Sequence, residues 1–380
     1  MPASAPRVVV SSDSFKGSCT SVEVGEAVGS GIRDVIPTAQ VTVVPVADGG
    51  EGTVAAALAA GFDPVTVPVH GPTGDPVTAT LALGGGGDGE DRTVVVEMAD
   101  ACGLTRLPGG APAPLTASSR GLGEALRAAL DLDPVTVVVG VGGSASTDGG
   151  AGMLAALGAR ARDPRGDPLA DGGAALADVA AFDDSGLDPR LSTVHLVLAA
   201  DVDSPLTGPR GAARVFGPQK GANPEHVEIL DTALARWAAV IDPDAADLPG
   251  AGAAGGVGYA LLAVLGATRR PGVDVVLDLV GLDAALDGAD LVVTGEGALD
   301  AQTRAGKAVT GVVRRADARA VPVVAVCGVD HLGAEDARAV GLAATYPLSE
   351  LEPDARRSME HAPELLRRQG ARIAEEWLTR

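Results

Sequence analysis

Loops that contain acidic residues and glycines follow several short apolar segments of this chain, at the points where buried strands should end. The loops lie at residues 11–18, 47–53, 140–150, 201–203 and 294–300. Carboxylates in such loops can hold a divalent cation, and glycines let backbone N–H groups approach an anion closely. Together the loops are typical of nucleotide-phosphate chemistry, in which metal ions and cations neutralise phosphate charge.

The lysines of the chain are not equally good candidates for functional residues. Lys16 lies inside a polar loop directly after a predicted strand, although it could be a solvated surface lysine. Lys220 and Lys307 are weaker candidates because lysines are common on surfaces, and Lys307, next to Gly306, is the better of these two. An acidic residue after a strand could likewise be only the N-cap of the next helix.

The two ends of the chain share one pattern of elements. Near the N-terminus a strand at 8–10 is followed by a helix that begins with the capping box Thr20–Glu23, and then by a strand at 41–46. Near the C-terminus we expect strands at 291–293 and 323–326, a loop at 294–300, and helices at 305–316 and 354–378. A strand–loop–helix–strand order predicts a parallel sheet.

The middle of the chain has a different pattern. Alternating segments at 65–70 and 77–83 flank a Gly-Pro turn and predict an antiparallel hairpin. Further strands are expected at 93–98, 135–139 and 194–200, and helices at 147–158, 225–240 and 255–265. We therefore expect an α/β protein with two domains: a parallel-sheet domain built from residues 1–72 and 288–380, and an inserted mixed α/β domain at 73–287.

Charge and composition exclude some partners. The 380 residues carry a formal net charge of −21, which would repel nucleic acid and anionic membranes. No apolar run reaches the ~18 residues of a membrane span, and no signal peptide is visible. The 3 cysteines are too few and scattered for a disulfide framework or a metal site, which favours the reducing cytoplasm.

Tests for known motifs leave two alternative functions open. The P-loop pattern G-x-x-x-x-G-K-[ST] and the nucleophile elbow G-x-S-x-G are both missing from the sequence. Residues 140–145 match G-x-G-x-x-A after a strand, which on its own is a weak dinucleotide fingerprint. A nicotinamide-dependent oxidoreductase and a non-catalytic nucleotide-binding protein are therefore the alternatives to a phosphoryl-transfer enzyme.

Six sequence blocks together resemble the bacterial glycerate kinases of the type 1 family. They lie at residues 13–17, 45–53, 142–152, 216–222, 252–256 and 294–297. The resemblance implies ATP-dependent phosphorylation of D-glycerate with Mg²⁺, 2-phosphoglycerate being the favoured product, and two domains of which one is flavodoxin-like. The sequence departs from the family pattern at Ser11-Ser12, where Ala-Pro is expected, and at 298–300.

With this resemblance the candidate residues receive roles. The catalytic candidates are one cation and three carboxylates: Lys16, Asp48, Glu51 and Asp201. The nucleotide-binding candidates are Gly142, Gly143, Ser144, Ser146, Thr147, Asp148, Gly295, Glu296, Gly297 and Lys307. The metal candidates are Asp48, Asp201, Glu296 and Asp300. Lys16 is expected to meet the carboxylate of glycerate, and the sequence leaves a homodimer open.

Overall fold

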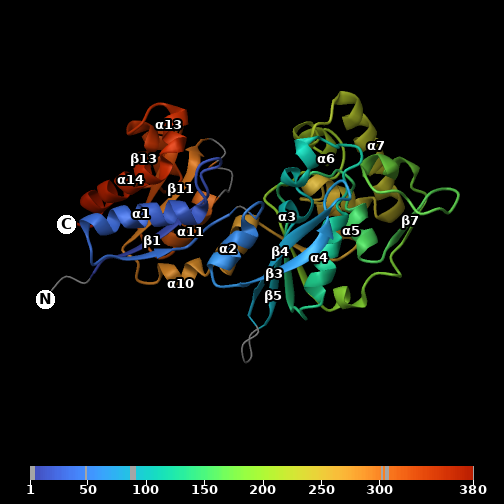
Figure 1. Cartoon of the computed structure of the whole chain (residues 1–380), viewed down its shortest axis with the longest axis horizontal. Helices are drawn as coiled ribbons and strands as arrows, with labels where there is room; N and C mark the ends of the chain where they lie inside the picture. The colour runs from blue at the N-terminus through green and yellow to red at the C-terminus, as the bar shows by residue number, and fades with distance from the viewer. Residues whose placement is uncertain (1–4, 48, 86–90, 301–302, 304–307, 380) are drawn as a thin grey trace. The chain divides into compact units, whose positions relative to one another are not determined.

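The computed structural model describes residues 5–47, 49–85, 91–300, 303 and 308–379. The chain forms two compact units, each built around its own sheet (Figure 1). Unit 1 comprises Met1–Asp48 and Val273–Arg380, and unit 2 comprises Gly49–Gly272. The α/β architecture predicted from the sequence is confirmed.

The sheet of unit 1 has five parallel strands in the order β13–β12–β11–β1–β2. They are β1 (Arg7–Ser12), β2 (Gln40–Val43), β11 (Leu291–Leu299), β12 (Val323–Asp330) and β13 (Ala344–Pro347). Numbered within the unit, this is the 2-1-3-4-5 order of the flavodoxin fold, whose switch point here lies between β1 and β11. The flavodoxin-like fold expected from the resemblance is therefore present.

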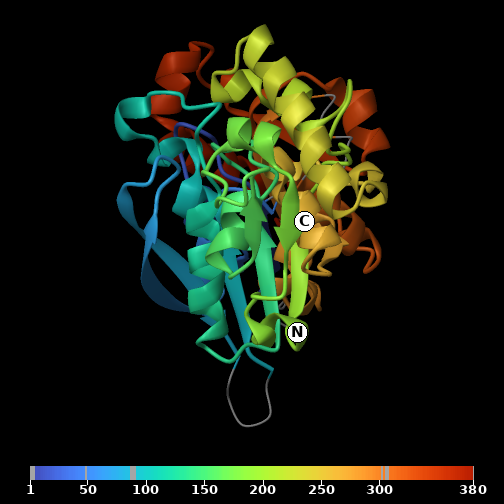
Figure 2. The same ribbon diagram turned by 90° about the vertical axis from the view of Figure 1, so that its right-hand side faces the viewer.

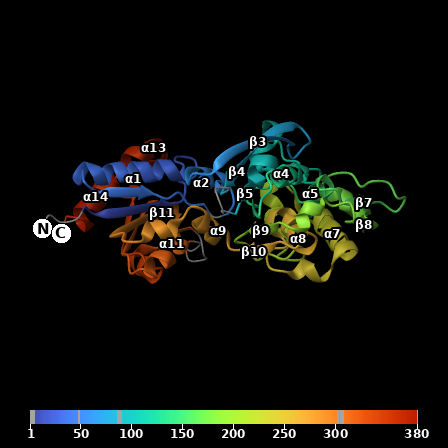
Figure 3. The same ribbon diagram turned by 90° about the horizontal axis from the view of Figure 1, so that it is seen from below.

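Both faces of this sheet are covered, which explains the buried valine runs at 8–10 in β1, 292–293 in β11 and 323–324 in β12. The helices of the unit are α1 (Ser21–Val35), α9 (Gly272–Leu279), α10 (Leu282–Leu286), α11 (Ala308–Asp317), α12 (Gly333–Ala339), α13 (Ala355–Glu360) and α14 (Ala362–Trp377). Val8 and Val10 belong to a core shared with α1 and α14, whereas Val9 and Val292 belong to a core shared with α9, α10 and α11. Figure 3 shows α1 and α14 on one side of the strands and α11 on the other.

Helix α1 begins at the predicted capping box. The Thr20 hydroxyl accepts the N–H of Glu23 at 3.3 Å, and the Glu23 carboxylate accepts the N–H of Thr20 at 2.8 Å. The helix then packs closely against α14, where a Cβ on Gly31 would collide with the carbonyl oxygen of Arg367. Glycine is therefore required at this crossing, and the first helix is fixed at its start and along its buried side.

The sheet of unit 2 has six strands in the order β10–β9–β6–β5–β4–β3. They are β3 (Asp63–His70), β4 (Pro76–Gly84), β5 (Thr93–Glu97), β6 (Thr136–Gly140), β9 (His195–Ala199) and β10 (Thr268–Arg270). β3 and β4 form the predicted antiparallel hairpin, β4 and β5 are also antiparallel, and the remaining pairs are parallel. A separate small sheet pairs β7 (Arg160–Arg162) with β8 (Ala181–Asp183).

The helices of unit 2 are α2 (Thr53–Ala59), α3 (Met98–Cys102), α4 (Arg120–Leu130), α5 (Ala151–Ala156), α6 (Ala212–Phe216), α7 (Pro224–Ile241) and α8 (Val257–Ala263). α4 contacts β3, β4 and β5, and packs beside α5 (Figures 1 and 2). None of the helices in the described part of the chain has both the length and the apolar character that crossing a bilayer requires.

The boundaries between the units differ from the expected ones at 72 and 288. Residues 63–70 belong to unit 2, because β3 pairs along its length with β4. Residues 273–287 belong to unit 1, because Val273, Leu277 and Leu282 are buried in its core. Each boundary therefore lies two elements away from its predicted position. The elements are α2 and β3 at the first boundary, and α9 and α10 at the second.

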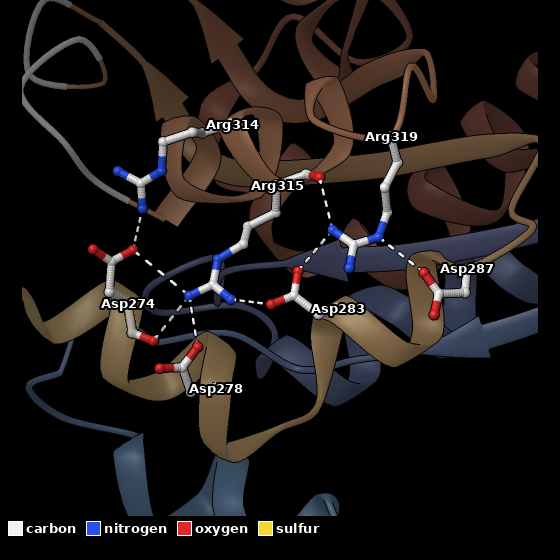
Figure 4. Close-up of polar contacts among 7 residues, drawn as sticks. All are labelled: Asp274, Asp278, Asp283, Asp287, Arg314, Arg315 and Arg319. Atoms are coloured by element: carbon white, nitrogen blue, oxygen red, sulfur yellow. Dashed lines mark hydrogen bonds and ion pairs between the residues drawn. The ribbon is translucent and has the colours of Figure 1, made fainter.

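An ion-pair network, shown in Figure 4, also holds α9 and α10 against α11. Arg315 is its centre: the guanidinium donates to Asp278 at 2.7 Å and also to Asp283. Arg319 donates to Asp283 at 2.9 Å and to Asp287 at 3.0 Å. Charge-assisted hydrogen bonds therefore join these three helices in addition to their apolar contacts.

Some elements differ in length from the expectation. The predicted final helix at 354–378 is two helices, α13 and α14, since the chain leaves helical geometry at His361 and Pro363 opens α14. The predicted helix at 147–158 covers only Ala151–Ala156, because Gly149 and Gly150 have positive φ. A left-handed backbone cannot continue a right-handed helix.

Candidate active site

A hollow of about 430 Å³ lies at the carboxyl ends of β1, β11 and β12 in unit 1. Four charged residues near the ends of β1 and β11 contribute to its lining: Asp13, Lys16, Glu296 and Asp300. Open parallel sheets bind ligands at this edge, beside the switch point of the strand order. The hollow therefore occupies the ligand-binding position of the fold and contains several of the sequence candidates.

Lys16 stands at the tip of a tight loop between β1 and α1. The loop is closed by two backbone hydrogen bonds: the N–H of Phe15 donates to the Cys19 carbonyl at 2.8 Å, and the N–H of Cys19 donates back at 3.0 Å. Gly17 has a φ of +83°, a conformation that favours glycine. Because Phe15 is buried in the core of the unit, the exposed Lys16 is presented from a fixed base.

The segment with Gly295, Glu296 and Gly297 is strand and not the predicted loop. β11 continues to Leu299, because Glu296 and Ala298 pair with residues of β12. Its end is tied to the Lys16 loop, where the N–H of Asp13 donates to the Gly295 carbonyl at 2.9 Å. Extended strands thus carry the candidate residues into the hollow more rigidly than a loop would.

Thr303 links two of the carboxylate residues of the hollow. Its hydroxyl donates to Glu296 Oε1 at 2.6 Å and accepts the backbone N–H of Asp300 at 3.0 Å. Thr303 is fully buried, so its hydroxyl fixes the position of the Glu296 carboxylate from the protein interior.

The carboxylates of the hollow fit a magnesium ion that also binds phosphate. Among the described residues, no three His, Cys, Asp or Glu side chains gather into a complete metal site. Mg²⁺ commonly binds through one or two carboxylates together with substrate phosphates. Glu296 and Asp300, which line the same hollow, would supply that number of carboxylates.

The glycine-rich loop of unit 2 differs from the expected phosphate cradle. Ser144, Ser146, Thr147 and Asp148 are all buried, with at most 6% of each residue exposed. Their side chains therefore shape the loop from inside and do not offer oxygens at its surface. Gly142 and Gly143 are the candidates of this loop that solvent reaches.

Asp148 serves as a hydrogen-bond acceptor for the surrounding backbone. Its carboxylate accepts the N–H and hydroxyl of Ser119 at 2.7 and 2.9 Å, and the N–H groups of Gly150 and Gly152 at 3.2 and 3.3 Å. Burial raises the pKa of this carboxyl above its usual value, and the four donors oppose that rise. The residue thus fixes the start of α5 against α4.

Lys220 is a functional candidate that the sequence analysis underrated. It is 2% exposed, so its interpretation as a surface lysine is wrong. Its Nζ donates to the Ser144 hydroxyl at 2.7 Å and to the Ser146 carbonyl at 2.5 Å. Burial lowers its pKa to about 8, while Asp148 and Cys102 favour the charged form.

Two glycine loops of unit 2 meet backbone to backbone. A Cβ on Gly142 would collide with the Cα of Gly50, and a Cβ on Gly140 would lie 3.0 Å from the Gly49 carbonyl oxygen. Glu51 is exposed beside this contact and lines a second hollow of about 440 Å³. Glycine is therefore required at Gly142 for the close approach of the two loops beside Glu51.

Glu97 forms part of the same hollow and was missed by the sequence analysis. It is 7% exposed and accepts the N–H groups of Gly52 and Val54 at 3.1 and 3.0 Å. Burial raises its pKa to about 7, and the neighbouring charges of Asp100 and Glu51 add to that rise. The signal that could have identified it was present, since Glu97 ends a buried valine-rich strand just as the other candidates do.

The structure therefore divides the predicted site residues into groups. In unit 1, the hollow collects Lys16, Glu296, Gly297 and Asp300. In unit 2, Glu51 lies by Gly142, whereas Asp201 lies after β9 and accepts the N–H of Gly272 at 2.7 Å. Asp48 and Lys307 lie outside the described residues.

The chain is similar to known proteins over nearly its whole length. Residues 8–378 match the model of the glycerate kinase family. The chain is 41% identical to a glycerate kinase of Bacillus subtilis over 97% of both chains, and 42% identical to a glycerate 2-kinase of Escherichia coli over 85% of both. A crystal structure of a protein from Salmonella typhimurium LT2, provisionally named glycerate kinase 2, is 44% identical, covers 98% of each chain and has a TM-score of 0.84.

These similarities extend over nearly the whole chain and include both units. They set aside the nicotinamide-dependent oxidoreductase and the non-catalytic protein that the sequence left open, because the relatives are named as kinases. The chain belongs to the glycerate kinase family and is a kinase that uses ATP.

Proposed function

We propose that the protein transfers the γ-phosphoryl group of ATP to D-glycerate, giving phosphoglycerate and ADP. The observation that carries this proposal is the presence of Lys16, Glu296 and Asp300 in one hollow at the ligand-binding edge of a flavodoxin-type sheet. Phosphoryl transfer is catalysed mainly by positioning and charge neutralisation, which a cation and two carboxylates can supply. The relatives named glycerate kinase support the choice of acceptor.

Within this proposal Lys16 meets the carboxylate of glycerate. Glu296 and Asp300 hold Mg²⁺, which when bound neutralises phosphate charge. One of Asp48, Glu51 and Asp201 accepts the proton of the attacking hydroxyl. Asp48 and Asp201 are also candidates for metal binding.

The glycine loop of unit 2 keeps a role in phosphate binding through its backbone. Gly142 and Gly143 are reached by solvent and lack side chains, so their N–H groups can approach an anion. Ser144, Ser146, Thr147 and Asp148 support the loop from within.

A Lys16→Ala variant tests the proposal. If Lys16 is the charge clamp, kcat/KM for glycerate should fall by roughly 10²–10⁴ while the circular dichroism and melting temperature stay unchanged. Arg356→Ala is the matched control, because Arg356 is an exposed cation of the same unit and its side chain is 88% accessible. Near-normal turnover in Lys16→Ala would contradict the assignment.

We further propose that the 2-hydroxyl of glycerate is the acceptor. The Escherichia coli relative named glycerate 2-kinase supports this position. Phosphorus NMR of the product distinguishes 2-phosphoglycerate from 3-phosphoglycerate directly. A spectrum showing only the 3-phosphate would overturn the choice of hydroxyl and leave the kinase proposal intact.

A cytoplasmic location is part of the same proposal. Cys19, Cys102 and Cys327 are all free and buried, as expected of a protein in a reducing compartment. A homodimer stays a prediction, which light scattering of the purified protein would test.

A further inference from the structure

We propose that the hollow of unit 1 binds the adenosine end of ATP against the segment that follows β13, so that this segment sets the affinity for nucleotide. The proposal rests on the proposed function, because it assumes that ATP and glycerate are the two substrates. It adds the location of the base, which neither the fold nor the relatives' names specify.

The lining of the hollow is of two kinds. Besides the charged residues named above, it includes apolar residues from the segment between β13 and α14 and from the first residue of α14. These residues, called the apolar wall below, are Leu348, Pro353, Ala355, Met359 and Ala362. A ligand that fills the hollow must therefore offer both apolar and charged groups.

Of the two proposed substrates, only ATP meets that requirement. Every carbon of glycerate carries oxygen, so glycerate has no apolar surface to pack against the wall. Contact with the wall would leave its hydroxyls without hydrogen-bond partners. The purine ring has apolar faces, and the phosphates are anionic. A hollow of about 430 Å³ also has the size of a site for a nucleoside-sized molecule, for which ~300–1,000 Å³ is usual.

Met359 is the most informative residue of the apolar wall. It is 47% exposed, so its side chain can contact a ligand from solvent. Its methyl group reaches the Lys16 loop, since a Cβ on Gly17 would lie 3.1 Å from Met359 Cε. A flexible thioether at the mouth of a hollow is well suited to contact an aromatic ring face.

The wall is held in place independently of any ligand. The Asp354 carboxylate accepts the N–H of Arg357 at 2.9 Å and caps α13, and Glu352 pairs with Arg357 at 3.2 Å. Ser349 and Glu352, from the same segment, also line the hollow and offer polar groups. The base would therefore contact a preformed surface that includes a few polar atoms.

Two substitutions at exposed positions test the proposal without disturbing the core. Met359→Asp places a carboxylate on the apolar wall, and Ala355→Trp fills the space in front of it. Leu248→Asp is the matched control, because Leu248 is 43% exposed and belongs to unit 2. The measurements are the Kd of ADP by calorimetry without glycerate, and the KM values for ATP and glycerate.

We expect both variants to weaken ADP binding and raise the KM for ATP at least tenfold, with the KM for glycerate within twofold and Leu248→Asp unchanged. Unaltered ADP affinity in both variants overturns the proposal, as does a rise confined to the KM for glycerate. If the wild-type protein binds ADP but does not phosphorylate glycerate, the proposed function fails while the location of the nucleotide is still tested by the binding data.

Discussion

The Nζ of Lys220 lies 2.5 Å from the carbonyl oxygen of Ser146 and 2.7 Å from the hydroxyl of Ser144. The two partners precede the glycine pair that opens α5, and Lys220 comes from a short turn after α6. One buried ammonium thus joins two segments of unit 2 that lie far apart in the chain. Its removal leaves a buried carbonyl without a donor, which is costly in a protein interior.

Replacing Lys220 with methionine should destabilise unit 2. The methionine keeps most of the volume but donates no hydrogen bond, so we expect a loss of roughly 1–3 kcal/mol in the free energy of unfolding at pH 7. Urea unfolding followed by the fluorescence of Trp237, which is buried in unit 2, measures the change. Lys16→Met is the matched control and should leave the unfolding midpoint unchanged, because Lys16 is exposed.

The effect of Lys220→Met on the free energy of unfolding should also depend on pH. In the folded protein burial lowers the pKa of Lys220 from 10.5 to about 8, so between these values the unfolded chain holds a proton that the folded chain has lost. The contribution of Lys220 to stability therefore rises with pH through this window, by about 3 kcal/mol in all. The difference in unfolding free energy between the wild type and Lys220→Met should grow from pH 7.5 to pH 9.5 by roughly 1–2 kcal/mol. A constant difference would contradict the assignment.

The sequence predicted the features of this fold that depend on local interactions. The capping box of α1 was identified because both of its partners lie within one turn, and the β3–β4 hairpin because its two strands are joined by a short turn. The parallel sheet followed from the order of strands and helices at the two chain ends, since crossovers in parallel sheets are short and of one hand.

The site could be predicted only in part, because burial depends on partners that are distant in sequence. Lys220 and Ser146 are 74 positions apart, and Asp148 and Ser119 are 29 apart. Nothing near Lys220 distinguishes it from a surface lysine, and nothing near Asp148 shows that four donors surround it. Glu97 and Glu296 both come shortly after a run of buried valines, yet only packing decides that Glu97 is buried and that Glu296 is half-buried.

Glu97 should make stability depend on pH in the acid range. Burial raises its pKa from 4.5 to about 7, so between these values the folded protein holds a proton that the unfolded chain has lost. The stabilisation that comes from this proton uptake is fully present below pH 4.5 and is lost as the pH rises through 7. The free energy of unfolding should fall by about 3 kcal/mol in total over this range. Glu97→Gln should remove this dependence, as measured by thermal unfolding from pH 4.5 to 7.5.

The neighbouring Glu51 provides the control for that experiment. It is exposed and lines the same hollow as Glu97. Glu51→Gln should therefore keep most of the wild-type slope of stability against pH, because burial, and not the charge of Glu51, is the main cause of the raised pKa of Glu97. Equal slopes for the wild type and Glu97→Gln would show that Glu97 does not titrate in this range.

Asp148→Asn should destabilise the junction of α4 and α5. The carboxylate accepts four hydrogen bonds, three of them at Oδ2, and asparagine would turn an NH₂ donor toward at least one of these donors. We expect a loss of roughly 1.5–3 kcal/mol, the range for hydrogen bonds to charged groups. In contrast, Asp171→Asn breaks the half-exposed pair with Arg120 in the same unit and should cost at most about 1 kcal/mol. Similar losses for the two variants in urea unfolding would refute the structural role of Asp148.

Arg315→Met should weaken the attachment of α9 and α10 to α11. The side chain of Arg315 is only 17% accessible and pairs with carboxylates on both helices, so its pairs are less screened by water than surface pairs are. We expect a loss of roughly 1–2 kcal/mol at low salt that shrinks as sodium chloride is raised to about 1 M. The control is Arg356→Met, which breaks an exposed pair with Glu360 one helical turn away and should change the unfolding free energy by less than about 0.5 kcal/mol. A loss that does not depend on salt would instead indicate that the methylene groups of Arg315, and not its charge, hold the helices together, because apolar packing is not screened by ions.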